Sequence, residues 1–262
     1  MDSKDLQRFL EELRAESTRI SDARAHASAS GQSSSSDPDL LTLLSQRTEQ
    51  LVKTNIDLLQ SYDVMLEALG DMIHLWDADT EHHSKRVTAF TIALARSLSL
   101  PADNIRDVAR GAFLHDIGKT GIPHSILCKP GALTPEEVEI MRRHCHRGYK
   151  LLRKIPFLAE AAEIVYAHHE HWDGTGYPRQ LKGNEIPLGG RIISVANTLD
   201  VITSDQPYRP AVCFSAARDE IARWSGRQLD PGVIEAFLGL PESIWQSLRT
   251  EISRQVSATV LD

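Results

Sequence analysis

The sequence is poor in cysteine and contains no long hydrophobic run. Its three cysteines, Cys128, Cys145 and Cys213, are odd in number and show no CxxC spacing, which favours a reducing compartment over a disulfide framework. No segment approaches the roughly 18 consecutive apolar residues of a membrane-spanning helix. The charged start at Met1 also lacks the apolar run of a signal peptide. We therefore expect a cytoplasmic chain without a membrane span.

Positive charge is in deficit as well. The 36 acidic residues outnumber the 29 basic ones and leave a net charge of −7. This balance argues against nucleic-acid binding driven by bulk positive charge, so no nucleic-acid partner is expected. With 262 residues, of which 41% are hydrophobic, the chain has the composition of a globular protein that buries a sizeable core.

Helical periodicity extends over most of the chain, and no strand pattern of any length is present, so the predicted fold class is all-α. Residues 1–39 are expected to form an amphipathic helix and a serine-rich linker. Residues 40–76 predict a long helix with a break near Gly70. A scaffold role and a dimerising or signal-transmitting role both remain open for this helix. Residues 77–262 form the domain that carries the motifs.

What the sequence does have is clustered histidine, since nine of the eleven histidines lie between His82 and His171. Eight of these nine occur in four groups on separate predicted helices or helix ends. Nitrogen and oxygen donors of this kind suit a borderline divalent metal, and groups from different helices are expected to converge inside one bundle. Adjacent His168 and His169 are costly to bury unless both rings are satisfied, which a metal would do. Cys145 could supply a thiolate, but its position beside His144 favours a packed thiol.

Several longer motifs occur in a fixed order between residues 70 and 240. They are His83-Ser84-x-Arg86-Val87, Leu114-His115-Asp116-Ile117-Gly118-Lys119-x-Gly121-Ile122-Pro123, His144-x-x-x-Gly148, His168-His169-Glu170-x-Trp172-Asp173-Gly174-x-Gly176-Tyr177-Pro178 and Leu181-Lys182-Gly183-x-x-Ile186-Pro187. Together they resemble the HD-GYP subfamily of the HD-superfamily phosphohydrolases. The resemblance implies an all-helical bundle with a site of two or three divalent metals, usually iron or manganese.

The resemblance also implies a role for individual residues. It assigns His83, His115 and Asp116 to one metal, and His144, His168 and His169 to a second, with Asp116 as the bridge. Lys119 and Asp116 are the expected catalytic residues, with Lys119 contacting the substrate phosphate. The expected substrate-binding residues are Tyr177, Lys182, Asp200 and Arg209. Asp79, four residues before His83, could bind a third metal, although an ordinary acidic residue at a helix start is an equal alternative.

Two positions depart from the family pattern. Asn197 replaces the aspartate that completes the first metal site, and its neutral carbonyl oxygen is a weaker ligand than a carboxylate. Gln206 replaces an arginine that meets a substrate phosphate, and glutamine brings no charge to that contact. Both changes lie within one segment of ten residues.

The favoured hypothesis is a metal-dependent phosphodiesterase that hydrolyses cyclic di-GMP to linear pGpG and/or GMP. Metal ions can make a nucleophilic water available near neutral pH and hold the phosphoryl oxygens, and Lys119 adds positive charge. The alternatives are a catalytically degenerate HD-GYP module that binds nucleotide or a partner protein, and hydrolysis of a related cyclic dinucleotide. The resemblance further suggests contact with diguanylate cyclase domains through Gly176-Tyr177-Pro178. The N-terminal helices could form a homodimer.

Overall fold

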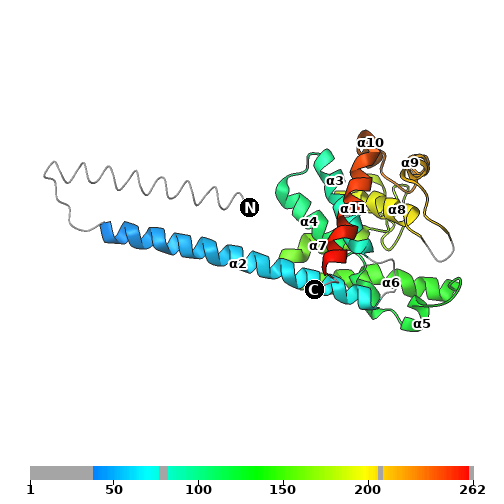
Figure 1. Ribbon diagram of the computed structural model, residues 1–262. Coiled ribbons are helices and arrows are strands. Elements are labelled where there is room, and N and C mark those ends of the chain that lie inside the picture. Colours follow the sequence, from blue (N-terminus) through cyan, green and yellow to red (C-terminus); the bar gives the residue numbers. More distant parts are fainter. Residues whose placement is uncertain (1–37, 77–81, 206–208, 260–262) are drawn as a thin grey trace. The chain divides into compact units, whose positions relative to one another are not determined.

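The structure is a computed structural model that describes residues 38–76, 82–205 and 209–259 (Figure 1). Within these ranges every regular element is a helix, and an isolated bridge joins Ser225 and Leu229. The all-α prediction is confirmed. The amphipathic helix and linker predicted before residue 38, the third-metal candidate Asp79 and the departure at Gln206 lie outside the described residues.

The chain divides into two compact units, residues 1–67 and 68–262. The first unit contains most of helix α2 (Pro38–Trp76), whose last residues belong to the second unit. The predicted break near Gly70 is wrong, because α2 continues through this residue. A Cβ at Gly70 would lie 2.3 Å from the ring of Phe113, so the glycine permits a close approach within the second unit.

The second unit is a bundle of helices joined by short turns. Its elements are α3 (His83–Ser97), α4 (Ala102–Phe113), the 3₁₀ turn η1 (Ile117–Gly121), α5 (His124–Leu127), α6 (Pro135–Leu152), η2 (Pro156–Leu158), α7 (Ala159–Ala167), η3 (Gly183–Glu185), α8 (Leu188–Thr203), α9 (Phe214–Arg223), α10 (Pro231–Gly239) and α11 (Glu242–Thr259). The apolar pattern and cap residues of the sequence predict helices over residues 87–98, 134–152, 157–169 and 189–203, and these correspond to α3, α6, α7 and α8 within a few residues.

Helices α3 and α8 form the centre of the hydrophobic core. Val87, Phe90 and Leu94 of α3 are fully buried, and α3 packs against α4, α8, α10 and α11. Trp245 of α11 meets the Phe90 ring edge to face, with the ring centroids 5.6 Å apart. Such a rigid aliphatic and aromatic core fixes the helix ends that carry the polar motifs. Leu199 extends the same core along α8.

Helix α6 begins where its sequence predicts. The Thr134 hydroxyl accepts from the amide of Glu137 at 3.3 Å, and the Glu137 carboxylate accepts from the amide of Thr134 at 2.7 Å. Pro135 occupies the first turn, where its missing N–H costs nothing. This cap fixes the start of α6, and therefore the turn on which His144 lies.

Candidate metal centre

Six of the residues predicted to bind metal come from the ends and faces of four helices. His83 starts α3, His115 and Asp116 follow α4, His144 lies on α6, and His168 and His169 follow α7. All are buried except His169, which is half-buried. Their donor atoms form two groups, each with its atoms within 4.8 Å of one another: His83, His115 and Asp116 in one, and His144, His168 and His169, with Cys145, in the other.

The approach of η1 to α6 places the two groups side by side. A Cβ at Gly118 would lie 1.9 Å from the carbonyl oxygen of His144, so the two backbones touch at this point. No other residue type fits there without moving one of the segments. Gly118 therefore holds the His115-Asp116 pair next to His144.

Four of the histidines are held in one tautomer by their Nδ1 atoms. The Nδ1 of His115, His144 and His168 lies 2.7–2.8 Å from the carbonyl oxygen three residues earlier, at Ala112, Met141 and Val165 respectively. A carbonyl can only accept, so each Nδ1 carries the proton. His83 likewise places its Nδ1 2.7 Å from the Asp200 carboxylate. In the neutral rings, each Nε2 then presents a lone pair to the centre, as metal-binding histidines do.

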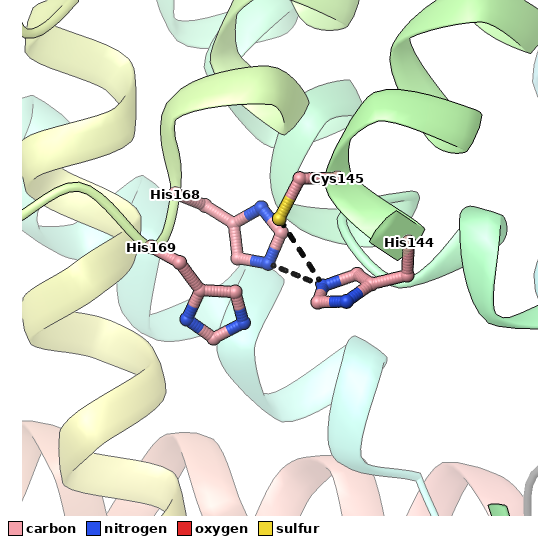
Figure 2. Close-up of side chains that lie close together, drawn as sticks. All are labelled: His144, Cys145, His168 and His169. Carbon is pink, nitrogen blue, oxygen red and sulfur yellow. Dashed lines mark hydrogen bonds between the residues drawn. The ribbon is translucent and has the colours of Figure 1, made fainter. Parts of the chain in front are cut away.

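These lone pairs face one another at short range. The Nε2 atoms of His144 and His168 are 3.3 Å apart. A dashed line joins them in Figure 2. With both Nδ1 atoms protonated, neither neutral ring has a proton to place between the two nitrogens. A shared cation, either a proton or a metal ion, resolves this repulsion. The donor set therefore fits a divalent metal.

The pKa values of this second group favour its neutral, metal-binding form. Burial, together with the neighbouring histidines, holds the pKa of His168 well below its ordinary value. Burial and His144 lower the pKa of His169 to about 3. Burial also lowers the pKa of His144, although the Asp116 carboxylate opposes it. The three rings are thus uncharged near neutral pH, which is the state in which imidazole binds a metal.

Asp116 connects the two groups. One carboxylate oxygen lies 3.1 Å from the Nε2 of His115 and 3.0 Å from the Nζ of Lys119, and the other lies 3.5 Å from the Nε2 of His144. Burial opposes its ionisation, but His115 and Lys119 hold the pKa of Asp116 well below the usual range. Burial likewise disfavours a charged His115, yet Asp116 raises the pKa of this ring. A proton on His115 thus supplies positive charge where a metal would.

Asp200 is placed differently from the prediction that it contacts substrate. Its carboxylate is fully buried and accepts from His83, from Arg86 at 2.6 and 2.9 Å, and from Arg249 at 3.1 Å. Both oxygens are therefore occupied by protein donors, and the prediction is corrected. Asp200 instead orients His83, the role that carboxylates commonly take behind metal-binding histidines. Sequence analysis missed Arg86 and Arg249 as its partners.

Asn197 lies on α8 between two contacts with the histidines. Ser194, one turn earlier, donates to the carbonyl oxygen of His168 at 2.8 Å, and Asp200, one turn later, binds His83. The Oδ1 of Asn197 is buried and has no hydrogen-bond partner among the described residues. An unpaired buried carbonyl oxygen is costly, and a metal ion would satisfy it. This atom fits the weakened ligand that the sequence predicts at this position.

Cys145 points toward the second group but is a thiol. Its Sγ lies 3.5 Å from the Nε2 of His144 (Figure 2). Burial, with Asp116 adding to it, raises the pKa of this cysteine far above its ordinary value. Because only the thiolate is a strong metal ligand, the geometry supports the packed thiol that the sequence favours.

The loop after α7 covers one side of the second group. The Tyr177 ring stacks on His169 with centroids 4.8 Å apart, and the Arg142 guanidinium lies over the Tyr177 ring at 5.0 Å. Glu170, which sequence analysis left without a role, is buried and accepts from the backbone amides of residues 179 and 181 at 2.7 and 3.0 Å. A Cβ at Gly176 would lie 2.2 Å from a backbone nitrogen, so the loop closes tightly there.

The other predicted substrate contacts lie on the surface. Lys182 is exposed, and its backbone amide donates to the Glu185 carboxylate at 2.9 Å at the start of η3. Arg209 is also exposed and donates to the carbonyl oxygen of Val201 at 3.1 Å. Neither residue makes a described contact with the histidine groups, so their contact with substrate remains a prediction.

The fold and the site define the class of protein. The HD domain family matches residues 67–233, and the chain belongs to this family. The HD-GYP resemblance is confirmed by relatives named cyclic di-GMP phosphodiesterase. One from Thermotoga maritima is 40% identical over 195 residues, covering 74% of this chain and 53% of the relative. One from Vibrio cholerae is 38% identical over 215 residues, covering 76% of this chain and 44% of the relative.

Another similar protein is named for a different cyclic dinucleotide. A 3'3'-cGAMP-specific phosphodiesterase of V. cholerae is 32% identical over 193 residues, covering 73% of this chain and 37% of the relative. The crystal structure of a V. cholerae cyclic GMP-AMP-specific phosphodiesterase matches with a TM-score of 0.51 and 23% identity, over 67% of this chain and 48% of that one, and shows the fold. The chain spans about half the length of these curated relatives or less. Among the described helices, none has the length and apolar character to cross a bilayer.

Proposed function

We propose that this chain is a metal-dependent phosphodiesterase that hydrolyses cyclic di-GMP to linear pGpG and/or GMP. The observation that carries the proposal is the pair of buried donor groups joined by Asp116, with the Lys119 ammonium 3.0 Å from the same carboxylate. A buried constellation of neutral imidazoles around one carboxylate is costly to assemble without a cation. Relatives named for this activity support the substrate class.

The two donor groups support the proposed metal-binding roles. His83, His115 and Asp116 would hold one metal, and His144, His168 and His169 the other, with Asp116 shared. Iron or manganese is the proposed metal, and Asp79 remains the proposed ligand of a third ion. When bound, the metals would supply a nucleophilic water near neutral pH and a Lewis acid for the phosphoryl oxygens.

The remaining groups of the chain act on the substrate and on the shape of the site. The Lys119 side chain is mostly buried, and its ammonium can bind a phosphoryl oxygen in an environment of low dielectric constant. Tyr177 covers His169 and leaves less room for bulk water beside the second group. Asp200 keeps the Nε2 of His83 directed at the first group.

Asn197 favours a second candidate function, a module that binds nucleotide or a partner protein without hydrolysis. Its neutral oxygen adds no charge to the first group, so a metal there would be bound less tightly than with aspartate. The two functions differ in metal content and in product, and both quantities can be measured on one preparation.

The test is elemental analysis of protein purified without oxygen, followed by hydrolysis assays with iron(II) or manganese(II). Cyclic di-GMP and 3'3'-cGAMP are compared at equal concentration, and products are separated by ion-exchange chromatography. Two or more metals per chain with linear product from cyclic di-GMP support the enzyme, provided that Asp116→Asn abolishes turnover. The matched control Asp219→Asn, on the exposed face of α9, should change nothing. Substoichiometric metal and no product from either nucleotide would overturn the proposal in favour of a binding module.

A further inference from the structure

Helix α2 carries a row of exposed apolar side chains at a strict interval. Leu44, Leu51, Leu58 and Met65 follow one another every seven residues, and they are 53%, 70%, 45% and 52% exposed. Single exposed leucines are common on protein surfaces, but a regular row of four is not. The row extends over about 32 Å of helix at 1.5 Å per residue.

An interval of seven is the signature of a two-stranded coiled coil. Two turns of a straight α-helix take about 7.2 residues, so a row of every seventh residue drifts around the helix by about 20° per heptad. Such a row stays in contact with a partner only when the two helices wind around each other. If the four residues occupy the d positions of the heptad, the a positions between them are Thr48, Asn55 and Tyr62. The seam would then alternate leucine or methionine layers with polar or amphipathic layers.

We propose that residues 44–65 of α2 pair with the same residues of a second copy of this chain, as a parallel coiled coil in register. The polar residue Asn55 favours an identical partner helix and a parallel orientation of the two helices. In a parallel pair, a positions meet a positions, so the two Asn55 side chains can bond to each other across the axis. In an antiparallel pair, a positions meet d positions, and Asn55 would face leucine with its amide unsatisfied.

The flanking residues also suit an identical partner. The positions beside the seam are Ser45, Val52 and Leu59 on one side and Arg47, Thr54 and Ser61 on the other. Arg47 is the only charged residue among them, and in a parallel pair it lies opposite an uncharged position. No like charges oppose each other between two copies, which is the usual obstacle to self-pairing. A second copy is therefore the occupant that the surface fits best.

Disulfide trapping tests the proposal in the full chain. The exposed cysteines are first removed as Cys128→Ser and Cys213→Ser, and the buried Cys145 is kept. In this background Leu44→Cys places a thiol near one end of the seam, and Gln46→Cys places one on the opposite face of the same helix turn. We expect Leu44→Cys to cross-link rapidly to a dimer under mild oxidation and Gln46→Cys to remain a monomer on denaturing gels.

Solution mass gives a second, independent measurement. Light scattering should report two chains for the unmodified protein, and one chain for the double variant Leu51→Asp and Leu58→Asp. The matched control Lys53→Asp should stay dimeric. Because these positions lie in the first unit, the melting transition of the HD domain should be the same in all three proteins.

Other results would overturn the proposal. A single-chain mass from micromolar to millimolar concentration would mean that the row is covered by another segment of this chain or by a different protein. If Leu44→Cys does not cross-link by itself but does cross-link to Met65→Cys when the two proteins are mixed, the pair is antiparallel. A mass of two chains that survives the double aspartate variant would place the dimer contact elsewhere.

Discussion

Replacing Asp200 by asparagine tests the buried charge cluster behind the first donor group. The substitution keeps the shape of the side chain but removes its charge. It leaves Arg86, which is 9% exposed, without its bidentate partner, while Arg249 is more exposed and loses less. Breaking a buried ion pair from one side costs about 3–5 kcal/mol. For a domain of this size, each kcal/mol shifts Tm by about 2–4 °C, so Tm should fall by roughly 6–20 °C.

The same substitution should also weaken metal binding at His83. An asparagine can turn its amide nitrogen toward the Nδ1 of His83, which removes the acceptor that fixes this ring. Loss of such a supporting contact typically lowers metal affinity about 10–100-fold. The affinity is measured by titrating manganese(II) into metal-free protein and following its paramagnetic resonance signal. The exposed Asp219→Asn serves as the matched control for both measurements.

The double variant Arg86→Met with Asp200→Asn separates the charge from other causes. If the unpaired guanidinium is responsible, removing it should recover part of the lost stability, and the two single effects should not add.

The pKa of Asp200 is lowered: burial opposes ionisation, but His83 and Arg86 outweigh it. The carboxylate therefore stabilises the fold above its unfolded pKa, about 3.9, and this contribution disappears as pH falls further. A Tm loss below about 3 °C at pH 7, with unchanged manganese affinity, would refute the reasoning.

Four further predictions concern the donor groups. Asn197→Asp should raise manganese affinity at least about tenfold in the same titration, since a carboxylate replaces a neutral oxygen. Cys145→Ala should leave metal content unchanged by elemental analysis and cost about 1 kcal/mol in urea unfolding, whereas loss of metal would mean that the thiolate is a ligand. Gly118→Ala should cost on the order of 3 kcal/mol in the same assay, because its Cβ meets the α6 backbone. The lowered pKa values of His168 and His169 mean that unfolding takes up protons, so metal-free protein should melt at lower temperature as pH falls below about 6.5, and a flat profile would contradict this.

Local features of this protein could be predicted from its sequence because they depend on neighbouring residues. The cap formed by Thr134 and Glu137 needs only the spacing of three residues, and the start of α6 was predicted correctly. The two sets of metal ligands were implied by the family resemblance rather than by local spacing, and the structure brings the donor atoms of each set close together. Gly70 was misinterpreted because a glycine can mark either a break or a close contact, and only the Phe113 ring shows which applies.

The role of Asp200 depends on contacts that no local pattern contains. Its partners Arg86 and Arg249 are 114 and 49 residues away along the chain. The family resemblance places Asp200 near the site. The sequence does not show, however, whether a side chain near a site faces the substrate or the core. Fully buried carboxylates are rare without a cationic partner, so burial decides this question, and burial is a property of the fold.

The charge balance of the two donor groups makes Asn197 the residue on which the choice between enzyme and binding module depends. When metal is bound, all five imidazoles are neutral, so the six described donors carry one formal negative charge, on Asp116. An aspartate at position 197 would add a second negative charge, hold cations more tightly and repel an incoming phosphodiester more strongly. The asparagine present at this position holds cations less tightly and repels the phosphodiester less strongly. If metal is present at cellular concentrations, the protein should bind an anionic nucleotide more tightly than the Asn197→Asp variant does, and calorimetry on manganese-loaded proteins measures this difference directly.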